Sequence, residues 1–101
     1  MIELEKDVEG YLKRKVEALG GQCLKWTSPG TTGLPDRIVL LPGGRVVFVE
    51  TKRPKGSRVA ALQNYWRKVL LGLGFSAYIA YTRQAIDALL TMEVNYADRT
   101  L

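Results

Sequence analysis

The apolar residues of this chain recur at two spacings, which divide the sequence into helices and strands. Near the beginning they fall every three or four positions, which predicts an amphipathic helix from about residue 2 to residue 19. Gly20 and Gly21 follow directly and end the predicted helix. Its apolar face consists of Leu4, Val8, Leu12, Val16 and Leu19.

Two short β-branched runs in the middle of the chain predict a hairpin. They cover residues 38–41 and 46–49, and Pro42, Gly43 and Gly44 lie between them. A three-residue loop with a glycine in the left-handed conformation would make Leu41 face Arg45. A two-residue loop would shift the register by one and turn every side chain of one strand to the other face. We predict the three-residue loop.

The remaining pattern predicts two more strands and two more helices. Residues 22–27 form a strand candidate, and residues 28–34 are a loop rich in Gly, Ser, Thr and Pro. A helix follows from about residue 57, with Val59, Leu62, Trp66, Val69, Leu70 and Leu73 directed toward the core. Residues 75–82 are apolar on both faces, which predicts an interior strand. A short helix is predicted for residues 83–92, and the polar tail from Glu93 has no strong pattern.

The predicted order is α-β-β-β-α-β-α, an α/β fold with a central mixed sheet flanked by helices. The 101 residues suffice for one domain with a substantial core but not for two, so we expect a single domain over residues 1–101.

Charged side chains stand at the ends of the two hairpin strands. In the three-residue register Asp36 faces Glu50, and Lys52 lies on the same face. Two carboxylates about 6 Å apart repel by roughly 3 kcal/mol at an effective dielectric of about 20, so a cation between them is favoured. Mg²⁺ binds in this way through one or two carboxylates and waters. On residue types alone, an ion pair at a sheet edge fits the same three residues equally well.

Pro35-Asp36, Glu50-Thr51-Lys52, Gly33 and Gln63 together resemble the PD-(D/E)xK nuclease superfamily, which has a restriction-endonuclease-like core, and within it the VRR-NUC branch. The resemblance implies a metal-dependent phosphodiesterase in which Asp36, Glu50 and the Thr51 carbonyl bind Mg²⁺ or Mn²⁺. It implies that Lys52 serves the attacking water.

The resemblance also adds residues from the two flanking helices. An early glutamate of the first helix completes the acidic cluster in this family, and Glu5 matches the pattern best, with Glu9 as the alternative. Each of them could instead be a solvated acid, and Glu9 could pair with Lys13 one turn later. Gln63 lies within an apolar helix face, where a buried amide needs partners, and the resemblance places it in the active site.

The net charge of +5 favours a polyanionic partner. A basic loop at residues 53–58 adjoins the acidic cluster, where it could hold a phosphate backbone. The residues that we expect to contact DNA are Ser28, Arg37, Arg53, Lys55 and Arg58.

The composition excludes several classes of protein. The chain has no histidine, which removes Ser-His-Asp catalysis and most zinc sites. Cys23 is the only cysteine and is predicted to be a buried strand residue in a protein of a reducing compartment. No apolar run of 18 residues and no signal-like start are present, so we expect no membrane contact and a cytoplasmic location, in a bacterial host if a phage encodes the protein.

These observations predict a Mg²⁺- or Mn²⁺-dependent DNA endonuclease. The small stand-alone VRR-NUC proteins that it resembles imply a homodimer acting on branched DNA, as a resolvase of four-way (Holliday) junctions. The aromatic candidates for the dimer interface are Tyr65, Trp66, Tyr78 and Tyr81. The alternatives are a flap, fork or nicking nuclease of the same fold, and a catalytically silent DNA-binding module. An RNA-binding domain fits less well, because the exposed aromatic pair typical of such modules is missing.

Overall fold

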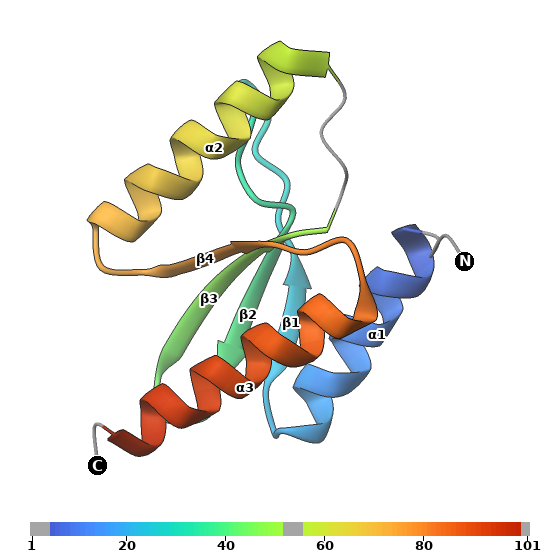
Figure 1. Ribbon diagram of the computed structural model, residues 1–101, viewed down its shortest axis with the longest axis vertical. Coiled ribbons are helices and arrows are strands. Elements are labelled where there is room, and N and C mark those ends of the chain that lie inside the picture. Colours follow the sequence, from blue (N-terminus) through green and yellow to red (C-terminus); the bar gives the residue numbers. More distant parts are fainter. Residues whose placement is uncertain (1–4, 52–55, 100–101) are drawn as a thin grey trace.

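The computed structural model describes residues 5–51 and 56–99, with side chains for residues 6–51 and 60–95. It confirms the predicted order of elements and the α/β fold class. None of the helices in these ranges has the length and apolar character needed to cross a membrane. The elements in chain order are α1 (Glu5–Ala18), β1 (Gln22–Lys25), β2 (Arg37–Leu41), β3 (Arg45–Glu50), α2 (Gly56–Gly72), β4 (Ser76–Ile79) and α3 (Arg83–Arg99) (Figure 1).

The four strands form one mixed sheet in the order β1-β2-β3-β4. β1, β2 and β3 are antiparallel to their neighbours, and β4 runs parallel to β3 after the crossover through α2. The prediction that the last strand is interior is therefore wrong, because β4 lies at the edge of the sheet. Its apolar residues on both faces are explained by helix packing: Ala77 is buried on the α2 side and Tyr78 packs on the α3 side.

The hairpin of β2 and β3 has the predicted three-residue loop. Leu41 pairs with Arg45, and the pairing continues in step to Arg37 opposite Val49. Gly43 and Gly44 both have positive φ angles, of 87° and 78°, which glycine adopts without steric cost. The register of the whole hairpin is thus fixed at this loop.

The sheet separates two apolar layers. On one face α1 and α3 lie side by side, and α2 covers the other face (Figure 1). Alternation along β3 explains the division, because Val47 and Val49 point to the first layer and Phe48 to the second. The first layer contains Val8, Leu12, Val16, Cys23, Val39, Val47, Val49, Ala80, Ile86, Leu89 and Leu90, and the second contains Phe48, Leu70 and Ala77 with Trp26, Ile38 and Val46 packed on them.

Fewer of the predicted apolar side chains of α2 are buried against the sheet than the sequence indicates. Leu70 is buried as expected, but Leu73 is 69% exposed because it lies in the turn after α2 ends. Leu19 is 40% exposed for the same reason after α1. Tyr65, Leu71 and Phe75 are also exposed, so α2 and the turn that follows it present apolar side chains to the surface.

The last helix is longer than predicted. α3 continues past residue 92 to Arg99, and Glu93, assigned to a tail without pattern, is only 3% exposed. Its carboxylate accepts hydrogen bonds from Ser76 and Tyr78 of β4 and forms an ion pair with Arg45 of β3. Glu93, the polar residue at which the apolar pattern of the sequence ends, therefore anchors α3 to the sheet through buried polar contacts.

The surroundings of Glu93 affect two pKa values. Burial acts to raise the pKa of Glu93, but hydrogen bonds from Tyr78, Arg45 and Ser76 outweigh it, and the pKa lies below its ordinary value. Burial and the hydrogen bond to Glu93 raise the pKa of Tyr78 to about 12. The ionised carboxylate and the neutral phenol are thus the forms that the fold stabilises.

Candidate active site

Both predicted acids lie at the same end of the β2–β3 hairpin. The pairing of β2 with β3 ends at this side with Arg37 opposite Val49, so Asp36 and Glu50 are the next residue of each strand in the same register. Glu50 is 4% exposed, and its carbonyl accepts a hydrogen bond from the Ala80 amide, which ties it to the end of β4. A carboxylate buried to this degree requires polar or cationic partners.

Thr51 holds the Asp36 carboxylate at two points. The Thr51 amide donates to Asp36 Oδ1 at 3.0 Å, and the Thr51 hydroxyl lies 2.9 Å from Asp36 Oδ2. Thr51 follows β3 directly and is 2% exposed. Because both oxygens are engaged by one residue, the orientation of the Asp36 carboxylate is fixed relative to the end of β3.

Among the described side chains of α1, the acid at this point is Glu9. Its Oε1 lies 3.3 Å from the Thr51 hydroxyl, and its Oε2 forms an ion pair with Arg37 at 3.1 Å. The side chain of Glu5, the preferred acid in the sequence, is outside the described side chains. The pairing of Glu9 with Lys13 is replaced by the pair with Arg37. Arg37, expected to contact DNA, has 16% of its side chain exposed and is engaged inside the protein.

The loop before Asp36 packs directly on α2. A Cβ added at Gly33 would lie 2.7 Å from the backbone carbon of Leu62, and Gly33 has a φ of +100°. This contact brings the start of the Pro35-Asp36 segment next to Gln63 of α2. The Gln63 Oε1 atom is buried and accepts no hydrogen bond from the described residues. A buried amide oxygen of this kind can accept from a water or a substrate group at the site.

The available donors fit a hard divalent cation. The carboxylates of Asp36 and Glu50 and the carbonyl of Thr51 offer only oxygen atoms, which Mg²⁺ and Mn²⁺ prefer. No group of three Asp, Glu or Cys side chains within the described residues could enclose a metal by itself. Mg²⁺ does not need such a cage, since it keeps several waters and uses one or two carboxylates together with substrate phosphate.

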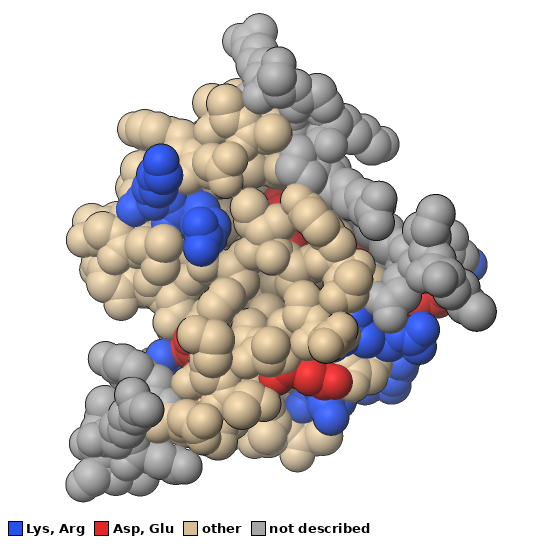
Figure 2. All heavy atoms as spheres, in the orientation of Figure 1, with Lys and Arg blue, Asp and Glu red and all other residues tan. Residues whose placement is uncertain are grey.

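Other predicted site residues lie partly outside the described part of the chain. Lys52, Arg53 and Lys55 are not described, nor is the side chain of Arg58 in the first turn of α2. Ser28 is half-buried in the loop between β1 and β2, where its carbonyl accepts from the Thr31 amide. On the face shown in Figure 2, basic side chains gather over α2 and over α1.

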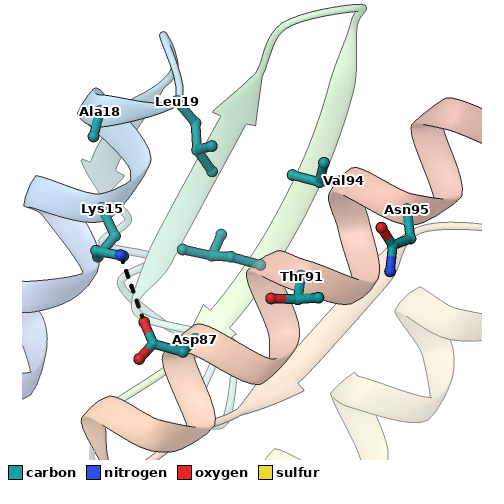
Figure 3. Close-up of a pocket in the computed structure, with 8 residues that line it drawn as sticks. Lys15, Ala18, Leu19, Asp87, Thr91, Val94 and Asn95 are labelled. Carbon is teal, nitrogen blue, oxygen red and sulfur yellow. Dashed lines mark ion pairs between the residues drawn. The ribbon is translucent and has the colours of Figure 1, made fainter.

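A pocket between α1 and α3 is separate from these residues. It has a volume of about 350 Å³, with Leu19, Leu90 and Val94 in its lining and the Lys15–Asp87 ion pair at one side (Figure 3). None of the predicted site residues lines it. The predicted site and this pocket are therefore different places in the fold.

Comparison with known proteins places the chain in a family. No family model matches the sequence. A protein of Acyrthosiphon pisum secondary endosymbiont phage 1 named "Putative nuclease p44" is 46% identical over 50 residues, which are 50% of this chain and 54% of that protein. The match thus spans about half the length of that relative. A solved structure described as a VRR_NUC domain superposes with a TM-score of 0.76 at 30% identity, covering 86% of this chain and 94% of that domain. The chain belongs to the VRR-NUC family.

Proposed function

We propose that the protein is a Mg²⁺- or Mn²⁺-dependent endonuclease that hydrolyses phosphodiester bonds of DNA. The observation that carries the proposal is that Thr51, which follows the buried Glu50 at the end of the hairpin, holds the Asp36 carboxylate through its amide and its hydroxyl. Membership of the VRR-NUC family and the name of the phage relative support the same reading.

Each residue of the site has a distinct task in this proposal. Asp36, Glu50 and the Thr51 carbonyl hold the cation. When bound, the cation supplies positive charge at the phosphate and lowers the pKa of a coordinated water. Lys52 orients or deprotonates the attacking water and stabilises negative charge on the phosphate. Gln63 accepts a hydrogen bond from a water or a substrate group through its buried Oε1.

The nuclease assignment is tested on labelled linear, flap, forked and four-way DNAs with Mg²⁺, Mn²⁺ or EDTA. We expect cleavage with either metal and none with EDTA. Lys52→Ala should abolish cleavage while DNA and metal binding persist, because the acids hold the ion. Lys15→Ala, at the pocket between α1 and α3, is the matched control and should cleave normally. Normal nicking by the Lys52→Ala protein would reject the assigned role, and DNA binding without cleavage under any metal would favour a silent binding module.

We further propose that the protein acts as a symmetric homodimer on four-way junctions. A four-way junction has near two-fold symmetry, and a C₂ dimer would supply a second site for the opposing strand. The exposed apolar residues of α2 and the following turn support an interface there, with Tyr65 at 57% and Leu73 at 69% exposure. Trp66 packs against Tyr65, whereas the Tyr78 hydroxyl is already bonded to Glu93.

Oligomeric state and substrate preference test this second proposal separately. Sedimentation at micromolar concentration should give a dimer, and Tyr65→Glu, which places a charge on the exposed face of α2, should give a monomer. Thr91→Glu, on α3 at the opposite face of the sheet, is the control and should remain dimeric. A monomeric parent, or a preference for flaps over four-way junctions, would reject this proposal and leave the nuclease proposal intact.

A further inference from the structure

The hydroxyl of Thr51 is not a metal ligand in the proposed function, which gives that role to the carbonyl of the residue. Yet the side chain is buried at 2% exposure and touches two carboxylates, Asp36 at 2.9 Å and Glu9 at 3.3 Å. A threonine that served only to fill space would not need a polar atom between two acids.

Two carboxylates lie within hydrogen-bond distance of the Thr51 hydroxyl, which has a single proton. A hydroxyl has one proton to donate, whereas ionised carboxylates only accept. The proton goes to the nearer Asp36 or is shared between both acids, and Glu9 has its second oxygen neutralised by Arg37 at 3.1 Å. These contacts join Arg37 to Glu9, Glu9 to Thr51 and Thr51 to Asp36. They connect α1 and the beginning of β2 to the end of β3.

The effect on Asp36 follows from its lone pairs. A carboxylate has about four lone-pair sites on two oxygens. The Thr51 amide uses one on Oδ1 and the hydroxyl uses one on Oδ2, so each oxygen keeps an acceptor site for a cation. Two bonds at the two oxygens also prevent the carboxylate from rotating.

We propose that the Thr51 hydroxyl is a positioning group for metal binding: it fixes the Asp36 carboxylate in its metal-ligating orientation and couples it to the Glu9–Arg37 pair. The inference rests on the proposed function, in which Asp36 is a metal ligand. Groups that orient metal ligands in this way change metal affinity by about 10–100-fold when they are removed.

The test compares two substitutions that differ only in the hydroxyl and the methyl group. Thr51→Val removes the hydroxyl at nearly constant volume and leaves the backbone amide and carbonyl in place, whereas Thr51→Ser keeps the hydroxyl. Mn²⁺ affinity is measured calorimetrically on the full chain without DNA. We expect Thr51→Val to bind about 10–100-fold more weakly and Thr51→Ser to keep most of the parent affinity. Cleavage by Thr51→Val should recover as the metal concentration is raised, because the defect is in metal affinity and not in the chemical step.

Ser76→Ala is the matched control. Its hydroxyl also donates to a buried carboxylate, Glu93, at 3.0 Å, but Ser76 begins β4 opposite Val47, three positions before the pair of Ile79 with Glu50. We expect this variant to lower the unfolding midpoint without changing Mn²⁺ affinity. If Thr51→Val does not fold, Thr51→Cys, with a weaker donor, carries the same expectation.

Three outcomes would overturn the inference. Parent-like Mn²⁺ affinity in Thr51→Val would show that the hydroxyl does not position the ligand. Equal weakening in Thr51→Val and Thr51→Ser would assign the effect to packing of the methyl group. A parent protein without divalent-metal binding would refute the proposed function itself, and the inference with it, whereas a parent that binds metal and cleaves beside an unaffected Thr51→Val variant refutes the inference alone.

Discussion

Replacement of Gly33 by alanine should disturb the site through α2 and not through the acids. Gly33 has a φ of +100°, and a Cβ there would lie 2.7 Å from both the backbone carbon and the Cβ of Leu62. Gly30, in the same loop, has a φ of +85° with no atom within 4 Å of an added Cβ. The two alanine variants therefore share the backbone strain and differ in the contact with α2.

The expected loss of stability in each variant follows from the backbone strain and from the contact with α2. A non-glycine residue in the left-handed region costs about 1–2 kcal/mol, which both variants lose. Carbon atoms pack at about 3.5–4.0 Å, so the Gly33→Ala methyl must push the Leu62 backbone away by roughly 1 Å. Overpacking of this kind costs about 1–3 kcal/mol more. For a chain of this size each kcal/mol lowers the melting temperature by about 4–8 °C, so Gly33→Ala should melt at least about 4 °C below Gly30→Ala.

The assay is thermal unfolding followed by circular dichroism, together with cleavage at a temperature where both variants are folded. We expect Gly30→Ala to cleave like the parent, whereas Gly33→Ala should cleave more slowly because Leu62 and the neighbouring Gln63 are displaced from the Asp36 segment. Equal melting temperatures and equal rates for the two variants would refute the argument that the close contact with α2 sets the geometry of the site.

Three further outcomes are expected. Glu93→Gln leaves the Arg45 charge without its carboxylate and should destabilise the fold by about 3 kcal/mol in urea unfolding, without loss of Mn²⁺ affinity. The pKa of Glu93 is lowered in the folded state, so its contribution to stability is present above the ordinary pKa of 4.5 and is lost as pH falls through the folded pKa. The parent should therefore lose stability in acid more steeply than Glu93→Gln. Parallel curves of unfolding free energy against pH would contradict this. DNA affinity should fall with salt, and Arg53→Gln with Lys55→Gln should reduce the slope of log affinity against log salt by about 1.8, since each phosphate contact adds about 0.9; an unchanged slope would exclude both residues as DNA contacts.

The sequence predicts those parts of the fold that local spacing determines. The stripe of Val8, Leu12 and Val16 is fully buried, and the turn residues fix the pairing of Leu41 with Arg45. The edge position of β4 cannot be predicted in this way. Helices that pack above and below a strand bury both of its faces, whether the strand has one neighbouring strand or two.

Two features of the site were also beyond the sequence pattern. The family resemblance implies a role for the Thr51 carbonyl alone, and nothing in the spacing shows that the side chain meets Glu9 from α1. The sequence pattern leaves Glu93 in a tail because a single acid interrupts the apolar spacing, and its partners Arg45, Ser76 and Tyr78 come from remote strands. Both are long-range polar contacts, which leave no periodic signal in the chain.

The loop of Pro42, Gly43 and Gly44 has a consequence for how the sequence can vary. No atom lies within 4 Å of an added Cβ at either glycine, so side chains that tolerate positive φ, such as asparagine, should be accepted there. One inserted or deleted residue is different, because it would exchange the two faces of β3, turning Val47 and Val49 toward α2 and Phe48 toward α1 and α3. In a library of random variants this exposed loop, at the opposite end of the strands from Asp36 and Glu50, should therefore accept residues that tolerate positive φ but should be invariant in length.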